Sequence, residues 1–238
     1  MPQFDHPDLT CTVADRQLAT ALARSFLSGL PSRLIDELIA AGDRIDVPAG
    51  STIYRQGGYP RAFLVISGLL RVYMTSAEGR QVTVRYARGG DVLGVAVLVG
   101  GPADVAVQAL AASGLFRIDR RILTAAGRRD AAVAWALAEE LNRRLYEALQ
   151  QAAANAFGSV RQRVARHLLD IASAEQRPGG PLVARVSQQD LADALGSVRE
   201  VVARVLRDFR AAGLVSTATD NIHVLDPVRL HDECWTVA

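Results

Sequence analysis

Lysine is absent from this chain of 238 residues, whose 27 basic residues are all arginine. This bias, together with the abundance of alanine, points to a GC-rich genome rather than to a binding function. Cysteine occurs only as Cys11 and Cys234, at opposite ends of the sequence. Neither a disulfide scaffold nor an iron–sulfur cluster, which needs about four cysteines, is therefore expected.

Long apolar runs are missing as well. None approaches the ~20 residues that a membrane-spanning helix requires, and the N-terminus lacks the basic-then-apolar pattern of a signal peptide. Half of the residues (50%) are hydrophobic, which is enough to form the cores of two domains. We expect a cytoplasmic protein with no membrane partner.

Histidine is scarce: none of the four histidines lies between residues 50 and 118, where Glu78 is the only glutamate. A cupin-type metalloenzyme needs a cluster of such ligands on its strands. We therefore expect no enzyme, and assign no catalytic residue, no metal and no cofactor. Ligation of haem iron by His6 and Pro2 is an alternative, although a disordered tail also accounts for both residues.

Residues 187–215 have the pattern of two helices joined by a tight turn. Ser187 is placed to cap the first helix, and Gly196 can adopt the left-handed conformation that ends it. The second helix is expected to bury one apolar stripe, formed by Val198, Val201, Val202, Val205, Leu206 and Phe209. This spacing is typical of a helix-turn-helix.

Charged residues occupy the opposite side of the second helix. Arginine pairs with guanine in the DNA major groove and a carboxylate accepts from cytosine, which suits Arg199, Glu200 and Arg204. Residues 158–238 hold ten arginines and ten acids, so the prediction depends on where the charges lie and not on bulk basicity. A solvated helical hairpin is the plain alternative. The predicted DNA-contacting residues are Ser187, Gln188, Ser197, Arg199, Glu200, Arg204 and Arg207.

A β-hairpin wing is expected next, as two short strands within Leu214–Leu225 around the turn Thr219-Asp220-Asn221. Asp226 and Pro227 then have the pattern of a cap and a first-turn proline. They predict a short final helix over about 227–235.

The first half has a different pattern, in which glycines separate short apolar runs. Such a pattern predicts a small antiparallel barrel or roll. The expected strands are Thr52–Tyr54, Ala62–Ile66, Leu69–Thr75, Gln81–Ala87, Asp91–Leu93, Val105–Ala109 and Gly114–Ile118. Two helices, Ala14–Ser28 and Ser32–Ala40, are expected before them.

A long helix is expected from Ala131 to about Phe157, where neither proline nor glycine intervenes. It could be a core helix of one subunit, but its length and position between two domains favour a coiled-coil seam with a second copy. A further helix, Val160–Ala174, follows a hinge at Gly158. The predicted dimer interface comprises Leu137, Leu141, Leu145, Leu149 and Ala152.

The predicted fold is α+β. It has an N-terminal antiparallel, jelly-roll-like β-roll with its helices (residues 1–130), a long dimerisation helix (131–157) and a C-terminal winged helix-turn-helix (158–238).

At family level, the chain resembles bacterial transcription regulators of the cyclic-AMP receptor protein/FNR superfamily. The segments that carry the resemblance are PAGSTIYRQGG, FLVISGLLRVY, EGRQVTVRYARGGDVLG and LADALGSVREVVARVLRDFRAAGLV. The resemblance implies a homodimer on a palindromic DNA site, with RNA polymerase as a further partner. Arg199-Glu200 and Arg204 match the cyclic-AMP-receptor branch, which implies a TGTGA-like half-site.

The nucleotide site of that family is not matched. Gly94-Val95 stands where the resemblance implies a Gly-Glu pair for the ribose, and Asp104-Val105 where it implies an Arg-Ser pair for the phosphate. An acid in place of a phosphate-binding arginine is repulsive.

Ala148-Leu149 stands where the resemblance implies a Thr-Ser pair that contacts the purine, so these polar contacts are lost. We therefore expect no cyclic-AMP binding, and a pocket that holds an apolar effector or is filled by its own side chains. Two alternatives stay open. In one, Arg85 and backbone amides near Val105 rebuild a cyclic-nucleotide site. In the other, the chain is a regulatory subunit that does not bind DNA, although such a subunit would lack a helix-turn-helix.

Overall fold

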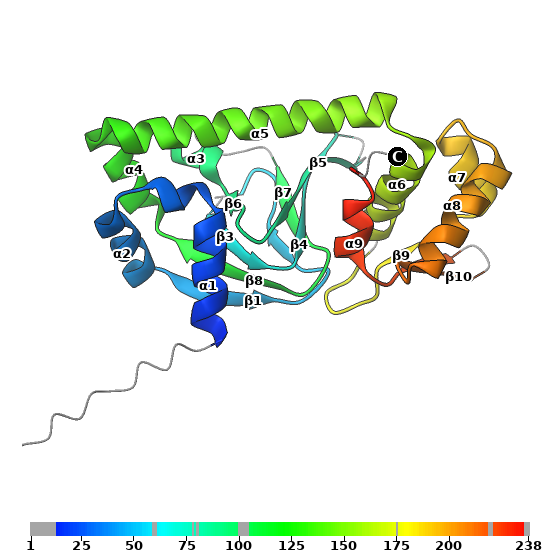
Figure 1. The fold of residues 1–238 in the computed structure, drawn as a ribbon, viewed down its shortest axis with the longest axis horizontal. Helices are drawn as coiled ribbons and strands as arrows, with labels where there is room; N and C mark the ends of the chain where they lie inside the picture. The colour runs from blue at the N-terminus through cyan, green and yellow to red at the C-terminus, as the bar shows by residue number, and fades with distance from the viewer. Residues whose placement is uncertain are drawn as a thin grey trace, which may run out of the picture.

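The computed structural model describes residues 13–58, 61–77, 79, 81–99, 105–174, 176–218 and 221–235. Its N-terminal half is a β-roll preceded by helices, and its C-terminal half is a winged helix-turn-helix (Figure 1). The predicted fold class is therefore confirmed. No helix in the described ranges is both long and apolar enough to span a membrane.

The roll consists of two four-stranded antiparallel sheets. One has the strand order β1-β8-β3-β6 and the other β2-β7-β4-β5. Side chains between the sheets, among them Val65, Leu70 and Leu115, form a buried core. The strands are β1 Asp43–Val47, β2 Thr52–Tyr54, β3 Ala62–Ser67, β4 Leu69–Thr75, β5 Gln81–Arg88, β6 Val92–Leu93, β7 Ala106–Ala109 and β8 Ser113–Ile118.

All seven strands predicted for the roll are present, with ends that shift slightly. Strand β1 was not predicted, because its sequence DRIDV carries three charged residues in five and only part of it is buried. The helix expected over Ala14–Ser28 is interrupted. Helix α1 is Val13–Arg24, and a 3-10 turn, η1, covers Phe26–Gly29. At the break the Ser25 hydroxyl donates to the Leu22 carbonyl, at 2.8 Å.

Helices cover one side of the roll. They are α2 Ser32–Ala41, α3 Val95–Val99, α4 Arg120–Arg129 and α5 Ala131–Phe157. Helix α5 is a single helix of 27 residues, over the range predicted for the connecting helix. Figure 1 shows it lying along the molecule from α4 to α6, with the roll on one side and no element on the other.

The C-terminal half has its own core around Phe209, Leu168 and Leu206. Its elements are α6 Val160–Ala174, β9 Val183–Ala184, α7 Gln188–Ala194, α8 Arg199–Ala211, β10 Val215–Ala218, β11 Asn221–Val224 and α9 Pro227–Asp232. The predicted wing is present as β10 and β11, which pair antiparallel. Of its predicted turn, Thr219 and Asp220 lie outside the described residues, and Asn221 begins β11.

The two halves are joined by a polar contact between α6 and the roll. Arg71 of β4 is 1% exposed, and its Nε donates to the Thr83 hydroxyl at 2.7 Å. The Thr83 hydroxyl in turn donates to the Asp170 carboxylate of α6, which also accepts from the Tyr86 hydroxyl at 3.1 Å. Asp170 lies 3.8 Å from the Arg71 guanidinium, so it supplies the opposite charge for a buried cation.

Asp170→Asn removes that charge and should lower the free energy of unfolding by about 2–3 kcal/mol. This is less than the 3–5 kcal/mol for breaking a fully buried pair, because the Asp170 side chain is 32% exposed. Urea denaturation of the full chain measures the change. Asp36→Asn, on the exposed side of α2, is the matched control and should change stability by less than about 0.5 kcal/mol. Equal effects of the two variants would contradict the assignment.

Candidate nucleic-acid interface and sensor site

The first helix of the helix-turn-helix is capped as predicted. The Ser187 hydroxyl accepts from the Asp190 backbone N–H at 3.1 Å and donates to the Asp190 carboxylate at 2.7 Å. Gly196 ends the turn with φ +58°, the left-handed conformation that glycine adopts without strain. The Ser197 backbone N–H then donates to the Ala192 carbonyl at 2.9 Å. The angle between α7 and α8 is thus fixed by short local contacts.

Helix α8 buries one side and exposes the other. Val202, Val205, Leu206 and Phe209 are buried. The prediction that Val198 belongs to this stripe is wrong. Val198 is 58% exposed, because it is the extended residue before the first helical turn (φ −109°, ψ 149°).

The predicted base-reading residues all lie on the exposed side of α8. Arg199, Glu200, Arg204 and Arg207 are exposed, and Ser187, Gln188 and Ser197 are half-buried nearby. At 100° per residue, Arg199, Glu200 and Arg204 span about 140° of the helix surface. They therefore form one continuous face on a rigid helix.

The wing and α6 hold this face in place. Arg210 Nη1 donates to the Thr217 hydroxyl of β10 at 2.9 Å, and Arg163 Nη1 donates to the Leu195 carbonyl at 2.6 Å. A hollow of about 310 Å³ lies between α7 and the wing, with Ser187, Gln188 and Arg199 in its wall. Three of the predicted DNA-contacting residues therefore line one concave surface.

The predicted effector pocket is occupied in part by the protein's own side chains. Val95 and Leu98 of α3 are 4% and 7% exposed and belong to a core shared with Leu123 of α4. Val105 is half-buried and packs against the core of the roll. Asp104 lies outside the described residues. Of the two expectations for this pocket, filling by its own side chains fits these positions better than an apolar effector.

The other residues predicted for the effector pocket include Leu149, Ala148 and Gly94. Leu149 is 55% exposed, so it is not enclosed in a pocket among the described residues of its own chain. Ala148, its neighbour, is half-buried. Gly94 has φ +78°, and a Cβ there would lie 2.7 Å from the Arg61 carbonyl oxygen. Gly94 thus has a backbone role whatever the pocket binds.

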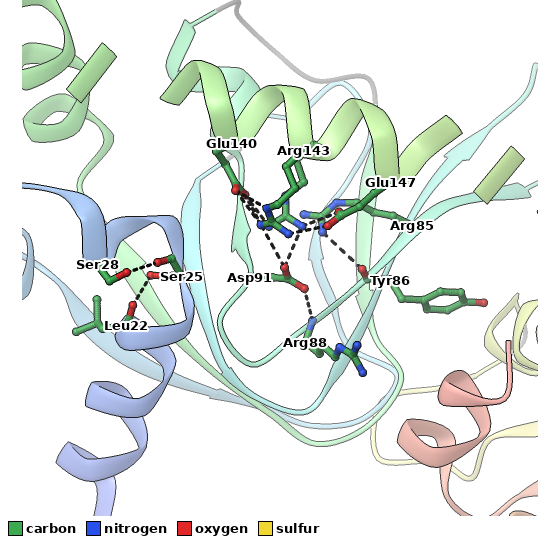
Figure 2. Close-up of polar contacts among 11 residues, drawn as sticks. Leu22, Ser25, Ser28, Arg85, Tyr86, Arg88, Asp91, Glu140, Arg143 and Glu147 are labelled. Carbon is green, nitrogen blue, oxygen red and sulfur yellow. Dashed lines mark hydrogen bonds and ion pairs between the residues drawn. The ribbon is translucent and has the colours of Figure 1, made fainter. Parts of the chain in front are cut away.

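A network of ion pairs lies between α5 and the roll (Figure 2). Arg144 pairs with Asp91 at 2.9 Å, with Glu140 at 2.7 Å and with Glu147 at 2.9 Å. Arg143 pairs with Glu140 at 2.8 Å and with Glu147 at 2.6 Å. Glu140 is only 2% exposed. Sequence reasoning did not predict this site, since Asp91 and the residues of α5 lie far apart in the chain.

Burial and charge shift the pKa values around this network. Burial alone would raise the pKa of Asp91, but Arg144 and the backbone N–H of Arg88 outweigh it and lower the pKa. Arg85 of β5 has its pKa lowered to about 10, first by burial and then by the like charge of Arg144. Asp91 and Glu147 act in the opposite direction and only partly offset this effect. Arg85, which the alternative of a rebuilt site invokes, therefore lies buried beside both Arg144 and these two carboxylates.

The predicted dimer interface is partly wrong. Leu137 is 5% exposed and packs in the core of its own chain. A Cβ on Gly127 of α4 would lie 3.2 Å from its Cδ1. Leu141 is half-buried against the same core, whereas Leu145 and Leu149 are 57% and 55% exposed. The side chain of Ala152 lies outside the description.

The exposed side of α5 has a heptad spacing that the sequence prediction did not identify. Successive steps of four and three residues pass through Ala131, Trp135, Ala138, Asn142, Leu145 and Leu149, all of which are exposed. We call these six residues the outer stripe. The same steps continue to Ala152 and Ala156 in the sequence.

Comparisons with known proteins match both halves. A family described as "Cyclic nucleotide-binding domain" matches residues 44–130, and one described as "Crp-like helix-turn-helix domain" matches residues 162–233. No curated protein matches the chain.

Several solved structures share the fold. A Crp/Fnr-family regulator from Eubacterium rectale is 26% identical with a TM-score of 0.57, over 89% of this chain and 98% of its own. FixK2 from Bradyrhizobium japonicum is 23% identical with a TM-score of 0.51, over 83% and 100%. The c-di-GMP-responsive global regulator CLP of Xanthomonas campestris is 23% identical with a TM-score of 0.50, over 82% and 100%.

The fold, the helix-turn-helix and these matches define a transcription regulator with a cyclic-nucleotide-binding-like domain and a DNA-binding helix-turn-helix domain. The chain belongs to the Crp/Fnr family of transcription regulators. Proteins of this family are regulators rather than enzymes.

Proposed function

We propose that this protein regulates transcription as a homodimer that reads a palindromic DNA site with α8. The observation that carries the proposal is the continuous exposed face formed by Arg199, Glu200 and Arg204 on a helix whose other side is buried. Arginine can donate two hydrogen bonds to guanine, and glutamate can accept from the amino group of cytosine. In this proposal residues 1–130 sense, 131–157 dimerise and 158–238 bind DNA.

The outer stripe supports the homodimer. Large apolar side chains exposed at heptad spacing on a 27-residue helix are typical of a coiled-coil seam. The carboxylates that face the roll, Glu140 and Glu147, fall on the opposite side of the same heptad. Asn142 takes an a position, where a single polar residue favours a two-stranded, in-register pair. A two-fold axis along α5 would place the two α8 helices in successive turns of the major groove.

Contact with RNA polymerase is part of this proposal and rests on the family alone.

The proposed effector is not cyclic AMP. The positions of its ribose and purine contacts are Val95, which is buried in the core, and Ala148 and Leu149, which have no hydrogen-bonding group. Asp104 stands at the position of the phosphate contact.

Arg199→Ala and Arg204→Ala should each weaken operator binding by about 1–3 kcal/mol, because each removes a bidentate pair to one guanine per half-site. Fluorescence anisotropy with a TGTGA-type palindrome and with random DNA measures the effect. Specific binding should fall far more than non-specific binding. Arg33→Ala, on α2 and away from α8, is the control and should bind as the unaltered protein does. Equal losses on both DNAs would mean that these residues contact only phosphates.

Leu145→Asp should convert the dimer to monomers and abolish operator binding, since it places a charge in the outer stripe. Light scattering gives the mass. Val82→Asp is the matched control, because Val82 is also exposed (62%) but lies on β5. A Leu145→Asp protein that stays dimeric would show that the subunits meet elsewhere.

Cyclic AMP and cyclic GMP should not bind at micromolar concentrations. Each lost charge-assisted hydrogen bond weakens binding by about 1.5–3 kcal/mol, and several are lost together. Isothermal titration calorimetry measures this directly. A micromolar dissociation constant would favour the alternative in which Arg85 takes part in a rebuilt nucleotide site.

A further inference from the structure

A hollow of about 300 Å³ opens where the roll, α5 and α9 meet. We call it the junction pocket. It lies apart from α3, whose Val95 stands at the family's ribose position. Its wall includes residues from four parts of the chain: Arg24 at the end of α1, Arg85 and Arg88 on β5, Arg143 on α5, and His231 and Trp235 at the C-terminus.

Two of the four arginines in this wall are already neutralised. Arg143 pairs with Glu140 and Glu147, and Arg88 pairs with Asp232 of α9 at 2.8 Å. Arg24 and Arg85 form no ion pair with any residue in the described part of the chain. The carboxylates of Asp91 and Glu147 also line the pocket and partly offset the charge of Arg85, but their ion pairs are with Arg143 and Arg144. Arg24 and Arg85 are therefore the two guanidinium groups of the wall that have no ion pair of their own in the described part of the chain.

Arg85 is the buried member of this pair. Burial and the like charge of Arg144 lower its pKa to about 10. Its Nη1 donates to the Tyr86 carbonyl at 3.5 Å, which is a long hydrogen bond (Figure 2). A bound anion would supply both the charge and the hydrogen-bond acceptors that this side chain lacks.

His231 adds a donor without a partner. Burial, and then Arg88, lower its pKa to about 4, so the ring is neutral near pH 7. Its Nε2 accepts from Trp235 Nε1 at 3.3 Å, which places the ring proton on Nδ1. Nδ1 is buried and has no hydrogen-bond partner among the described residues.

We propose that the junction pocket binds a small phosphate-bearing anion, held between Arg24 and Arg85. A guanidinium presents paired N–H donors that match phosphate oxygens, and the volume suits a compact metabolite rather than a large nucleotide. The pocket includes residues of both the roll and α9, so the anion would brace the DNA-binding domain against the sensor domain. The effect on DNA binding rests on the proposed function, but the binding itself does not.

Titration of the full chain with inorganic pyrophosphate, at constant ionic strength and without DNA, tests the site by calorimetry. Pyrophosphate should bind, and Arg24→Gln and Arg85→Gln should each weaken it by about 10-fold or more, the factor that corresponds to losing one charge-assisted hydrogen bond. Arg33→Gln is the matched control and should bind with unchanged affinity. No binding to the unaltered protein, or equal affinity in all variants, would overturn the proposal. Malonate in a parallel titration separates a phosphate site from a general anion site, and tighter binding of malonate would overturn the phosphate assignment.

Operator affinity, measured with and without pyrophosphate at constant ionic strength, tests the coupling. By reciprocity, an anion that braces the DNA-binding domain must change operator affinity, and Arg85→Gln should abolish that change. A change of the same size in Arg85→Gln would overturn the coupling, because pyrophosphate would then be competing with DNA. Failure of operator binding both with and without pyrophosphate would instead contradict the proposed function.

Discussion

Glu140 is a buried residue of α5, and its carboxylate pairs with Arg143 and Arg144 of the same helix. Arg144 also pairs with Asp91 of the roll. Burying charges costs solvation energy, and such pairs often specify geometry more than they stabilise the fold. Here the pairs with Asp91 specify which side of α5 faces the roll. Arg143 and Arg144 lie on α5 together with Glu140, so turning the helix would separate both arginines from Asp91 of the roll. Asp91 would then be left mostly buried without its cations, which costs several kcal/mol.

The rotational position of α5 has consequences on both sides of the helix. On the inner side it orders Arg143 and Glu147 beside Arg85, and so forms one wall of the junction pocket. On the outer side it exposes Trp135, Asn142 and Leu145 at heptad spacing. The proposed two-fold axis, and hence the separation of the two α8 helices, follows from which side of α5 faces outward.

Local chemistry made much of the fold predictable. The cap at Ser187, the glycine at 196 and the glycines between the strands of the roll act within a few residues, and these predictions are confirmed. Strand β1 was missed because its pairing with β8 is non-local and its sequence is charged. The face of α5 was predicted wrongly at Leu137, since apolar residues occur on both sides of the helix. A spacing of three and four fits either side, and only contact with α4 and the roll selects one. The base-reading residues stay a prediction that the geometry of α8 accommodates.

The ion pairs between α5 and the roll thus determine that the outer stripe forms the proposed contact between subunits. Cysteine cross-linking in a Cys11→Ser background tests it directly, since Cys234 is buried. Asn142→Cys lies at the a position of the outer stripe, whereas Leu141→Cys lies on the stripe predicted from sequence. Identical residues at an a position face one another across a parallel two-fold seam. The account predicts disulfide-linked dimers under mild oxidation with Asn142→Cys and few with Leu141→Cys. The opposite result, or no cross-linking of either variant in a protein that is dimeric, would contradict it.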